Sequence, residues 1–283
     1  MTEERHDRNV RFFGAEGQER LRATSVGIVG IGGLGTQLVQ QLSLLGVGRL
    51  LLIDPEELDD TNRNRYVGAR ASDPVPGSPK VELGKRLAQE IDPTIVVEAI
   101  RAPLIDARAF QALQGVEYVF GCLDNDGARL VLTELTAAYE LTYIDLATEI
   151  LPDGTHGGRL VVALNGEGCP VCFDELDVEA AQADLGNSAA RAARAAIYGV
   201  DATLLTAAGP SVVSLNGVVA SLGVTEFMVS VTGLRPPQTR LRYRGNRGIV
   251  THDDSPPAAD CFYCKGIRGR KDSADVERYL RGR

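Results

Sequence analysis

Residues 25–37 read SVGIVGIGGLGTQ, and this stretch decides the fold. A short apolar run leads into a loop with the spacing G-x-G-x-x-G, and the residues after it repeat apolar side chains with a helical period. Residues 49–54 form a second apolar run that ends on Asp54. The pattern predicts a βαβ unit whose loop holds nucleotide phosphates at a helix N-terminus. The glycines of this loop are Gly30, Gly32, Gly33 and Gly35.

The acid that ends the second run indicates which class of ligand binds. Asp54 lies 19 residues after Gly35 (54 − 35). An acid at this place binds ribose hydroxyls in dinucleotide folds. The spacing therefore predicts a bound ribonucleotide, and at this point both NAD and ATP fit.

Polar residues further along the chain favour ATP. Asn62, Arg65 and Lys80 follow the Asp54 strand, and Asp124 ends another predicted strand, residues 116–124. The carboxyl ends of parallel strands share one edge of a sheet, where ligands bind. Cations with one acid fit a nucleoside triphosphate and Mg²⁺, whereas hydride transfer needs no such cluster. Simpler interpretations are surface cations, an Asx turn at Asn62 and a helix cap at Asp124.

Composition and charge exclude several classes of protein. The chain has 283 residues, 44% of them hydrophobic, which is enough for one large α/β domain or two modest ones. A net charge of −8 argues against a general nucleic-acid binder. We find no run of membrane-spanning length and no signal-peptide pattern, so we expect a cytoplasmic protein.

The remaining pattern predicts alternating helices and strands in a single domain. We expect an ATP-binding half, residues 1–165, and a substrate-binding half, residues 166–283, with a mobile or partly helical crossover at 173–205. The predicted helices are 15–22, 80–92, 127–140 and 209–234. The further predicted strands are 94–100, 141–148, 158–164, 239–245 and 248–253.

A set of motifs resembles one family over nearly the whole chain. RHDRNVRFFGAEGQERL, GIGGLG, DPEELDDTNRNRY, GSPK, CLDN, CPVC and CFYC occur here in the order seen in the ThiF/MoeB/HesA family, the relatives of ubiquitin-activating enzymes. The expected fold is α/β: a Rossmann-like mixed sheet flanked by helices, parallel in the nucleotide-binding half and antiparallel in the second half. Arg63 and Tyr66 depart from the family's usual Leu and Gln.

The resemblance implies a reaction and the residues that carry it. The family adenylates the C-terminal carboxylate of a ubiquitin-like or sulfur-carrier protein, whose tail ends in Gly-Gly. Matched to its motifs, Asp54 holds the ribose, Asp124 holds Mg²⁺, and the phosphates lie against Asn62, Arg65 and Lys80. Arg8 matches an arginine that reaches the other subunit's site, which implies a homodimer. Alternatives are adenylation of a short peptide, a non-catalytic partner subunit, and an NAD oxidoreductase.

Four of the five cysteines form two C-x-x-C pairs. They are Cys169, Cys172, Cys261 and Cys264. Four thiolates suit tetrahedral Zn²⁺, and a redox dithiol or an iron–sulfur site is the alternative. The resemblance favours structural zinc, because the pairs stand at the family's zinc positions. Cys122 lies in an apolar run and is predicted to be a core residue, and the crossover has no cysteine for a thioester.

Overall fold

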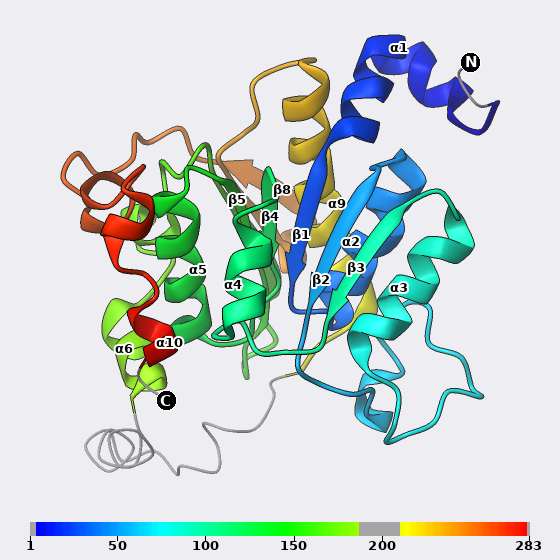
Figure 1. The fold of residues 1–283 in the computed structure, drawn as a ribbon, viewed down its shortest axis with the longest axis horizontal. Helices are drawn as coiled ribbons and strands as arrows, with labels where there is room; N and C mark the ends of the chain where they lie inside the picture. The colour runs from blue at the N-terminus through cyan, green and yellow to red at the C-terminus, as the bar shows by residue number, and fades with distance from the viewer. Residues whose placement is uncertain (1–3, 187–209, 282–283) are drawn as a thin grey trace.

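The computed structural model describes residues 4–186 and 210–281, which build an α/β fold around one mixed sheet (Figure 1). The strand order is β3-β2-β1-β4-β5-β6-β7-β8. Pairing is parallel from β3 to β5 and antiparallel from β5 to β8, which confirms the expected fold class. The strands are β1 Ser25–Val29, β2 Arg49–Ile53, β3 Val96–Ile100, β4 Tyr118–Gly121, β5 Thr142–Ile150, β6 His156–Ala163, β7 Arg240–Arg244 and β8 Ile249–His252.

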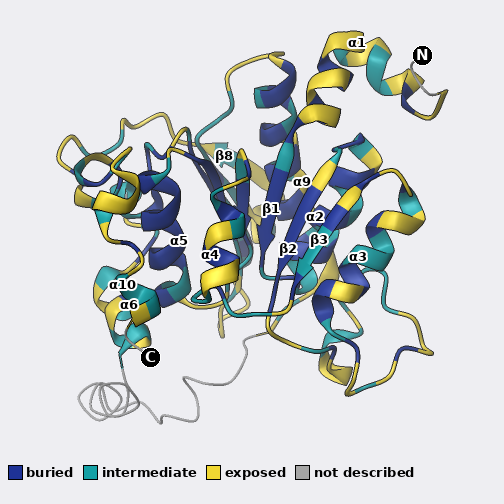
Figure 2. Cartoon of the chain, in the orientation of Figure 1, coloured by how far each residue is buried: buried dark blue, intermediate teal, exposed yellow. Residues whose placement is uncertain are grey.

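Helices cover both faces of the sheet, and the strand sequences show why. In β2, Leu50 and Leu52 pack in one core while Leu51 and Ile53 pack in another, because successive side chains point to opposite faces. Both faces of the central strands are buried, as Figure 2 shows, so β1, β2 and β4 are apolar after their first residue. The longer helices are α1 Asp7–Ala23, α2 Gly33–Leu45, α3 Lys80–Ile91, α4 Ala107–Leu113, α5 Asp126–Ala138, α6 Val178–Leu185 and α9 Val213–Thr232.

Short helical segments fill the connections and the C-terminal part. Helices α2, α3 and α9 pack on the first face of the sheet, whereas α4 and α5 pack on the second, where the C-terminal segment also lies. The short segments are η1 Glu4–His6, η2 Asp60–Asn62, η3 Pro170–Phe173, η4 Gly245–Arg247, the π-helical turn η5 Phe262–Gly266, η6 Lys271–Ala274 and α10 Arg278–Arg281.

The structure differs from the sequence prediction at two helices. Helix α1 begins at Asp7, eight residues before the predicted start, and turns sharply at Gly14, whose φ is +78°. Helix α4 was not predicted, although Asp106 caps it by accepting the backbone N–H of Arg108 and Ala109. Of the predicted crossover, 187–205 lie outside the described residues, and the part before them contains α6.

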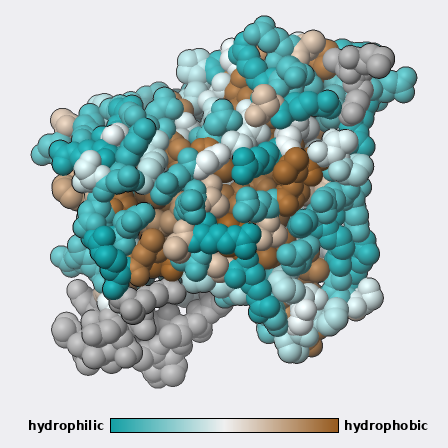
Figure 3. Space-filling model, viewed as in Figure 1, coloured by the Kyte–Doolittle hydropathy of each residue, from teal (hydrophilic) through white to brown (hydrophobic). Residues whose placement is uncertain are grey.

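Helix α9 is the one helix in the described ranges that is long and apolar enough to cross a membrane. It packs against α1, α2, β5 and β6, and over half of its most apolar window is buried, as in the core helix of a globular fold. Figure 3 shows a face made mostly of hydrophilic side chains, with the hydrophobic ones gathered toward its middle.

Candidate functional site

A cavity of about 1040 Å³ opens at the carboxyl ends of β1, β2, β4 and β5. In the sheet order, β1 lies between β2 and β4, so this is the switch point where open α/β sheets bind ligands. The volume is at the upper end for ligand pockets and leaves room for a nucleotide and a second ligand. The predicted site residues that line it are Gly30, Gly32, Gly33, Asp54, Asn62, Arg65, Lys80 and Asp124.

The glycine loop is held by close backbone packing. Gly30 has a φ of +92°, and a Cβ there would lie 2.4 Å from the carbonyl oxygen of Cys122. A Cβ on Gly35, just outside the cavity, would lie 2.0 Å from the Gly30 carbonyl oxygen. A residue with a side chain fits at neither place without moving backbone. The glycines thus let α2 start directly against the end of β1.

Asp54 fastens this loop from the end of β2. One carboxylate oxygen accepts the backbone N–H of Ile31 at 2.7 Å, and the other accepts that of Glu56 at 2.8 Å. Burial raises the pKa of Asp54, and these two bonds and the charge of Lys80 oppose the shift. The acid predicted to hold a ribose therefore also fixes the loop beside it.

Two cations approach the cavity from the segment after β2. The Lys80 side chain is 7% exposed at the start of α3, and its ammonium pairs with Glu56. The Lys80 backbone carbonyl accepts the Tyr66 hydroxyl at 2.7 Å. Arg65 donates from Nη1 to the Thr61 carbonyl oxygen at 2.5 Å. The backbone of Lys80 and the side chain of Arg65 are thus held in place, and Tyr66 is a packing residue of this segment.

The same segment settles two further sequence details. Arg63 donates to the carbonyls of Arg70 and Asp73, so it holds the loop together and does not line the cavity. Asp59 accepts the Thr61 N–H at 2.7 Å and caps η2. The side chain that makes the turn in this segment is therefore Asp59, whereas the simpler interpretation had given this role to Asn62. Asn62 lines the cavity.

Asp124 and its neighbours form the loop between β4 and α5. Asn125 caps α5 by accepting the N–H of Ala128 at 2.8 Å, so the simpler interpretation of Asp124 as the cap is wrong. Its carboxylate is exposed to the cavity and accepts the Asn125 side-chain amide at 3.2 Å. An accessible carboxylate in a cavity that could also hold phosphates is a suitable ligand for Mg²⁺.

The four paired cysteines meet in one cluster apart from the cavity. Their sulfur atoms all lie within 4.8 Å of one another. The Cys169–Cys261 sulfur distance is 3.7 Å and the Cys172–Cys264 distance is 3.2 Å, both too long for a disulfide bond. Zn–S bonds of about 2.3 Å in a tetrahedron place sulfur atoms about 3.8 Å apart. The cluster could therefore hold zinc with four protein ligands.

The comparisons with known proteins give the family. The ThiF family model matches residues 6–261. The chain belongs to the ThiF family. Among curated ThiF relatives, the SAMP-activating enzyme E1 of Haloferax volcanii is 29% identical over 161 residues, 53% of this chain and 59% of the relative. The molybdopterin-synthase adenylyltransferase of Salmonella typhimurium is 35% identical over 127 residues, 44% of this chain and 50% of the relative.

Solved structures share the fold of this ThiF chain. The crystal structure of E. coli MccB with MccA-N7isoASN has a TM-score of 0.73 and 18% identity, covering 93% of this chain and 75% of MccB. PaaA has a TM-score of 0.66 and 20% identity, covering 88% and 72%. The chain spans between half and six-tenths of the length of the two curated relatives above.

The structure of this ThiF chain also places Arg8 and Cys122, the first away from the cavity and the second in its wall. Arg8 is exposed on α1 and does not line the cavity of its own chain. In Figure 1 the start of α1 lies at the upper right, whereas the chain enters α9 low in the view, and Pro210 and Ser211, just before α9, line the cavity. Cys122 packs against the core as predicted, but it is half-buried and also lines the cavity. Burial raises the pKa of its thiol, with the charge of Arg129 opposing, so the thiol stays protonated.

The sequence analysis missed residues that reach the ThiF cavity from the second half of the chain. Asn216 of α9 is buried, accepts the Thr148 hydroxyl at 3.1 Å and donates to the Ser211 hydroxyl at 3.1 Å. A Cβ on Gly33 would lie 2.5 Å from the side-chain amide nitrogen of Asn216. Arg129 of α5 also lines the wall. A polar residue within an apolar helix was the one available signal for Asn216.

Proposed function

We propose that this chain binds ATP in the cavity and adenylates the C-terminal carboxylate of a ubiquitin-like or sulfur-carrier protein, with release of pyrophosphate. One observation carries the proposal: Asp54, Asn62, Arg65, Lys80 and Asp124 line one cavity beside the glycine loop. The names of the curated relatives, an activating enzyme E1 and an adenylyltransferase, support it.

The proposed reaction requires that the carboxylate is aligned with the α-phosphorus and that the negative charge of the departing pyrophosphate is neutralised. A C-terminal carboxylate has a pKa of about 3.3–3.7, so it is already ionised at neutral pH and needs no general base. Its oxygen attacks the α-phosphorus, and the bond to pyrophosphate breaks. Arg65 and Lys80 would neutralise the triphosphate and its leaving group. Asp124 would hold Mg²⁺, which supplies further positive charge to the phosphates.

Two proposed elements lie outside the cavity. The four paired cysteines would hold one Zn²⁺, which would be structural because four protein ligands leave no open position. Arg8 would reach the cavity of a second copy, since it stands away from its own cavity. We therefore propose a cytoplasmic homodimer with two sites, each completed by Arg8 of the other copy.

A short peptide is the second candidate for the acyl substrate. It rests on the fold likeness to MccB, whose structure was determined with MccA. The cavity leaves space beyond the glycine loop on the side of Thr148 and Ser211, where either tail would enter. A non-catalytic partner subunit is disfavoured, because the expected ATP residues other than Gly35 all line the cavity.

Exchange of labelled pyrophosphate into ATP tests the proposal. We expect Mg²⁺-dependent exchange that requires a candidate carrier ending in Gly-Gly or a short peptide. Asp124→Ala should lower the rate by about 10²–10³-fold, as for loss of one electrostatic contact to the transition state. Cys122→Ala is the matched control from the same wall and should retain the rate. We expect no thiol-sensitive covalent adduct on this chain, and an adduct that is lost in Cys122→Ala would contradict this expectation. Full activity of Asp124→Ala would contradict the metal assignment.

A further inference from the structure

The Asp124 loop is held by a buried arginine at the back of the cavity wall. Arg129 lies one turn into α5 and is 6% exposed. Its Nη2 donates to the carbonyl oxygen of Leu123, the residue before Asp124, and lies 3.3 Å from the Leu146 carbonyl oxygen of β5. The guanidinium thus ties the loop to the neighbouring strand.

The guanidinium is itself fixed by a fully buried acid. Asp145 of β5 has no exposed surface and accepts Arg129 Nη1 at 2.5 Å and the Tyr143 hydroxyl at 2.8 Å. Its other oxygen accepts Arg159 of β6. Burial alone would raise the pKa of Asp145, but the charges of Arg129 and then Arg159 outweigh it and the pKa is lowered. Asp145 therefore stays ionised, and Arg129 keeps one orientation.

The two ends of the Asp124 loop are held differently. On the helix side, Asn125 makes the cap of α5 and donates to the Asp124 carboxylate. On the strand side, the Leu123 carbonyl is held by Arg129. Without that bond, the peptide preceding Asp124 can rotate, and the carboxylate loses its fixed direction into the cavity.

We propose that Arg129, locked by Asp145, is a positioning residue that aims the Asp124 carboxylate at the metal–nucleotide. The inference rests on the proposed function in that it takes Asp124 as the ligand of Mg²⁺. It adds a buried charge pair whose arginine lines the cavity wall and acts on Asp124 through the Leu123 carbonyl. Supporting groups of this kind commonly change metal affinity by about 10–100-fold when removed.

Metal binding in the presence of ATP tests the proposal without turnover. The probe is Mn²⁺ with ATP, and the readout is the electron paramagnetic resonance signal of free Mn²⁺. Arg129→Gln should weaken Mn²⁺ binding to the ATP complex about tenfold or more, while ATP binding in EDTA stays within about twofold. The same substitution should raise the Mg²⁺ concentration for half-maximal pyrophosphate exchange.

Removal of one partner of a buried ion pair can unfold a protein, because it leaves an unpaired charge. The double variant Arg129→Gln/Asp145→Asn removes both charges, and Arg159 keeps its pairing with Glu175, whose Oε2 lies 3.0 Å from Nε. This variant should fold and show the same weakened Mn²⁺ binding. A purely structural pair would instead give near wild-type Mn²⁺ binding.

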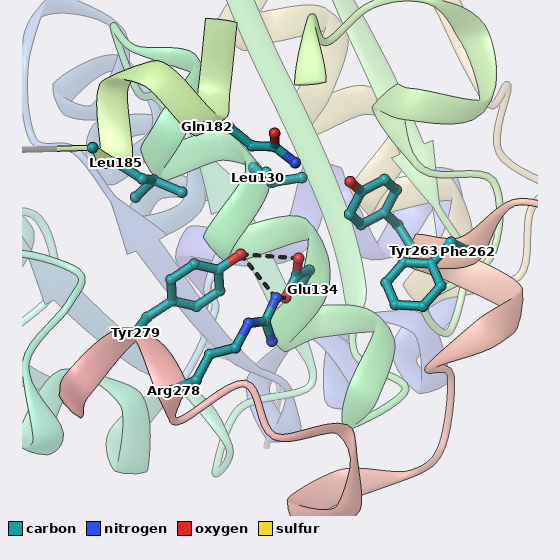
Figure 4. Close-up of a pocket in the computed structure, with 9 residues that line it drawn as sticks. Leu130, Glu134, Gln182, Leu185, Phe262, Tyr263, Arg278 and Tyr279 are labelled. Carbon is teal, nitrogen blue, oxygen red and sulfur yellow. Dashed lines mark hydrogen bonds and ion pairs between the residues drawn. The ribbon is translucent and has the colours of Figure 1, made fainter. Parts of the chain in front are cut away.

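Helix α5 offers a matched control on its far side. Glu134 is 2% exposed and accepts Arg278 at 2.5 Å and the Tyr279 hydroxyl at 2.9 Å, as Figure 4 shows. Arg278→Gln removes the partner of another buried acid on α5 without touching residues 123–125, although the Arg278 side chain is itself 40% exposed. It should lower stability and leave Mn²⁺ binding unchanged.

The outcomes separate this proposal from the proposed reaction. Weakened Mn²⁺ binding in both Arg129 variants, with no exchange activity in the unmodified protein, would support the positioning role and contradict the adenylation. Wild-type Mn²⁺ binding in the double variant, or an equal loss in Arg278→Gln, would overturn the positioning role. Unmodified protein that binds no Mn²⁺–ATP would overturn both.

Discussion

Gly35→Ala should destabilise the fold by moving the glycine loop. The added Cβ would lie 2.0 Å from the Gly30 carbonyl oxygen, and real contacts of this kind are essentially never under 3.0 Å. Neither the Gly30 carbonyl oxygen nor the new Cβ can move away by rotation of a side chain. The Gly30 peptide must therefore shift by at least about 1 Å. The same peptide region carries the Ile31 N–H, which donates to Asp54 at 2.7 Å. A shift of that size breaks this bond.

The expected cost has two parts. Overpacking costs about 1–3 kcal/mol, and loss of a hydrogen bond to a charged group costs about 1.5–3 kcal/mol. The free energy of unfolding should therefore fall by about 2.5–6 kcal/mol. Urea unfolding followed by circular dichroism measures it. A loss below about 1 kcal/mol would refute the packing argument.

Gly32→Ala is the matched control in the same loop. A Cβ there meets nothing within 4 Å, and the φ of −88° suits any residue. Its stability cost should be at most about 1 kcal/mol, since alanine is a poorer N-cap than glycine. Gly32 lines the cavity, so the methyl group should instead weaken ATP binding, as calorimetry can measure. Unchanged ATP affinity would contradict the placement of phosphates against this loop.

Three further predictions follow from other parts of the chain. The purified protein should contain about one zinc per chain by elemental mass spectrometry, and Cys169→Ser should lose it with a loss of stability; iron in its place would contradict the assignment. Mixed dimers of Arg8→Ala and Asp124→Ala chains should regain exchange activity, since one site in each is intact, and no recovery would exclude action across the dimer. Hydrogen bonding to Arg86 lowers the pKa of Asp73 from 3.8 to about 2. That pair should stabilise the fold above about pH 4 and lose its effect as the pH falls towards 2, so Asp73→Asn should flatten the acid-unfolding curve there.

The sequence predicted the parts of the fold that depend on local pattern. Apolar runs bounded by glycine and acid located the parallel strands, and the spacing from Gly35 to Asp54 placed the cavity. Helix α4 was missed because residues 107–113 are short and Ala-rich, without a clear apolar period. Its capping Asp106 was the available signal.

Local sequence patterns could not predict the contacts between segments that are distant in the sequence. Arg129 and Asp145 are 16 residues apart, and they meet because α5 packs beside β5. The sequence analysis made no prediction for Asp145, and an acid inside a buried strand requires a partner without showing which residue it is. Asn216 reaches the glycine loop because α9 packs across α2, which no local spacing predicts.

The fate of labelled oxygen tests the central claim most directly. A carrier ending in Gly-Gly, with ¹⁸O in its terminal carboxylate, is incubated with the protein, Mg²⁺ and ATP, and hydroxylamine then attacks the acyl carbon. Adenylation joins a carboxylate oxygen to the α-phosphorus, and that oxygen remains on AMP when the acyl bond breaks. Mass spectrometry should therefore find one ¹⁸O atom in AMP and none in pyrophosphate. Label in inorganic phosphate, or AMP without ¹⁸O, would contradict adenylation of the tail.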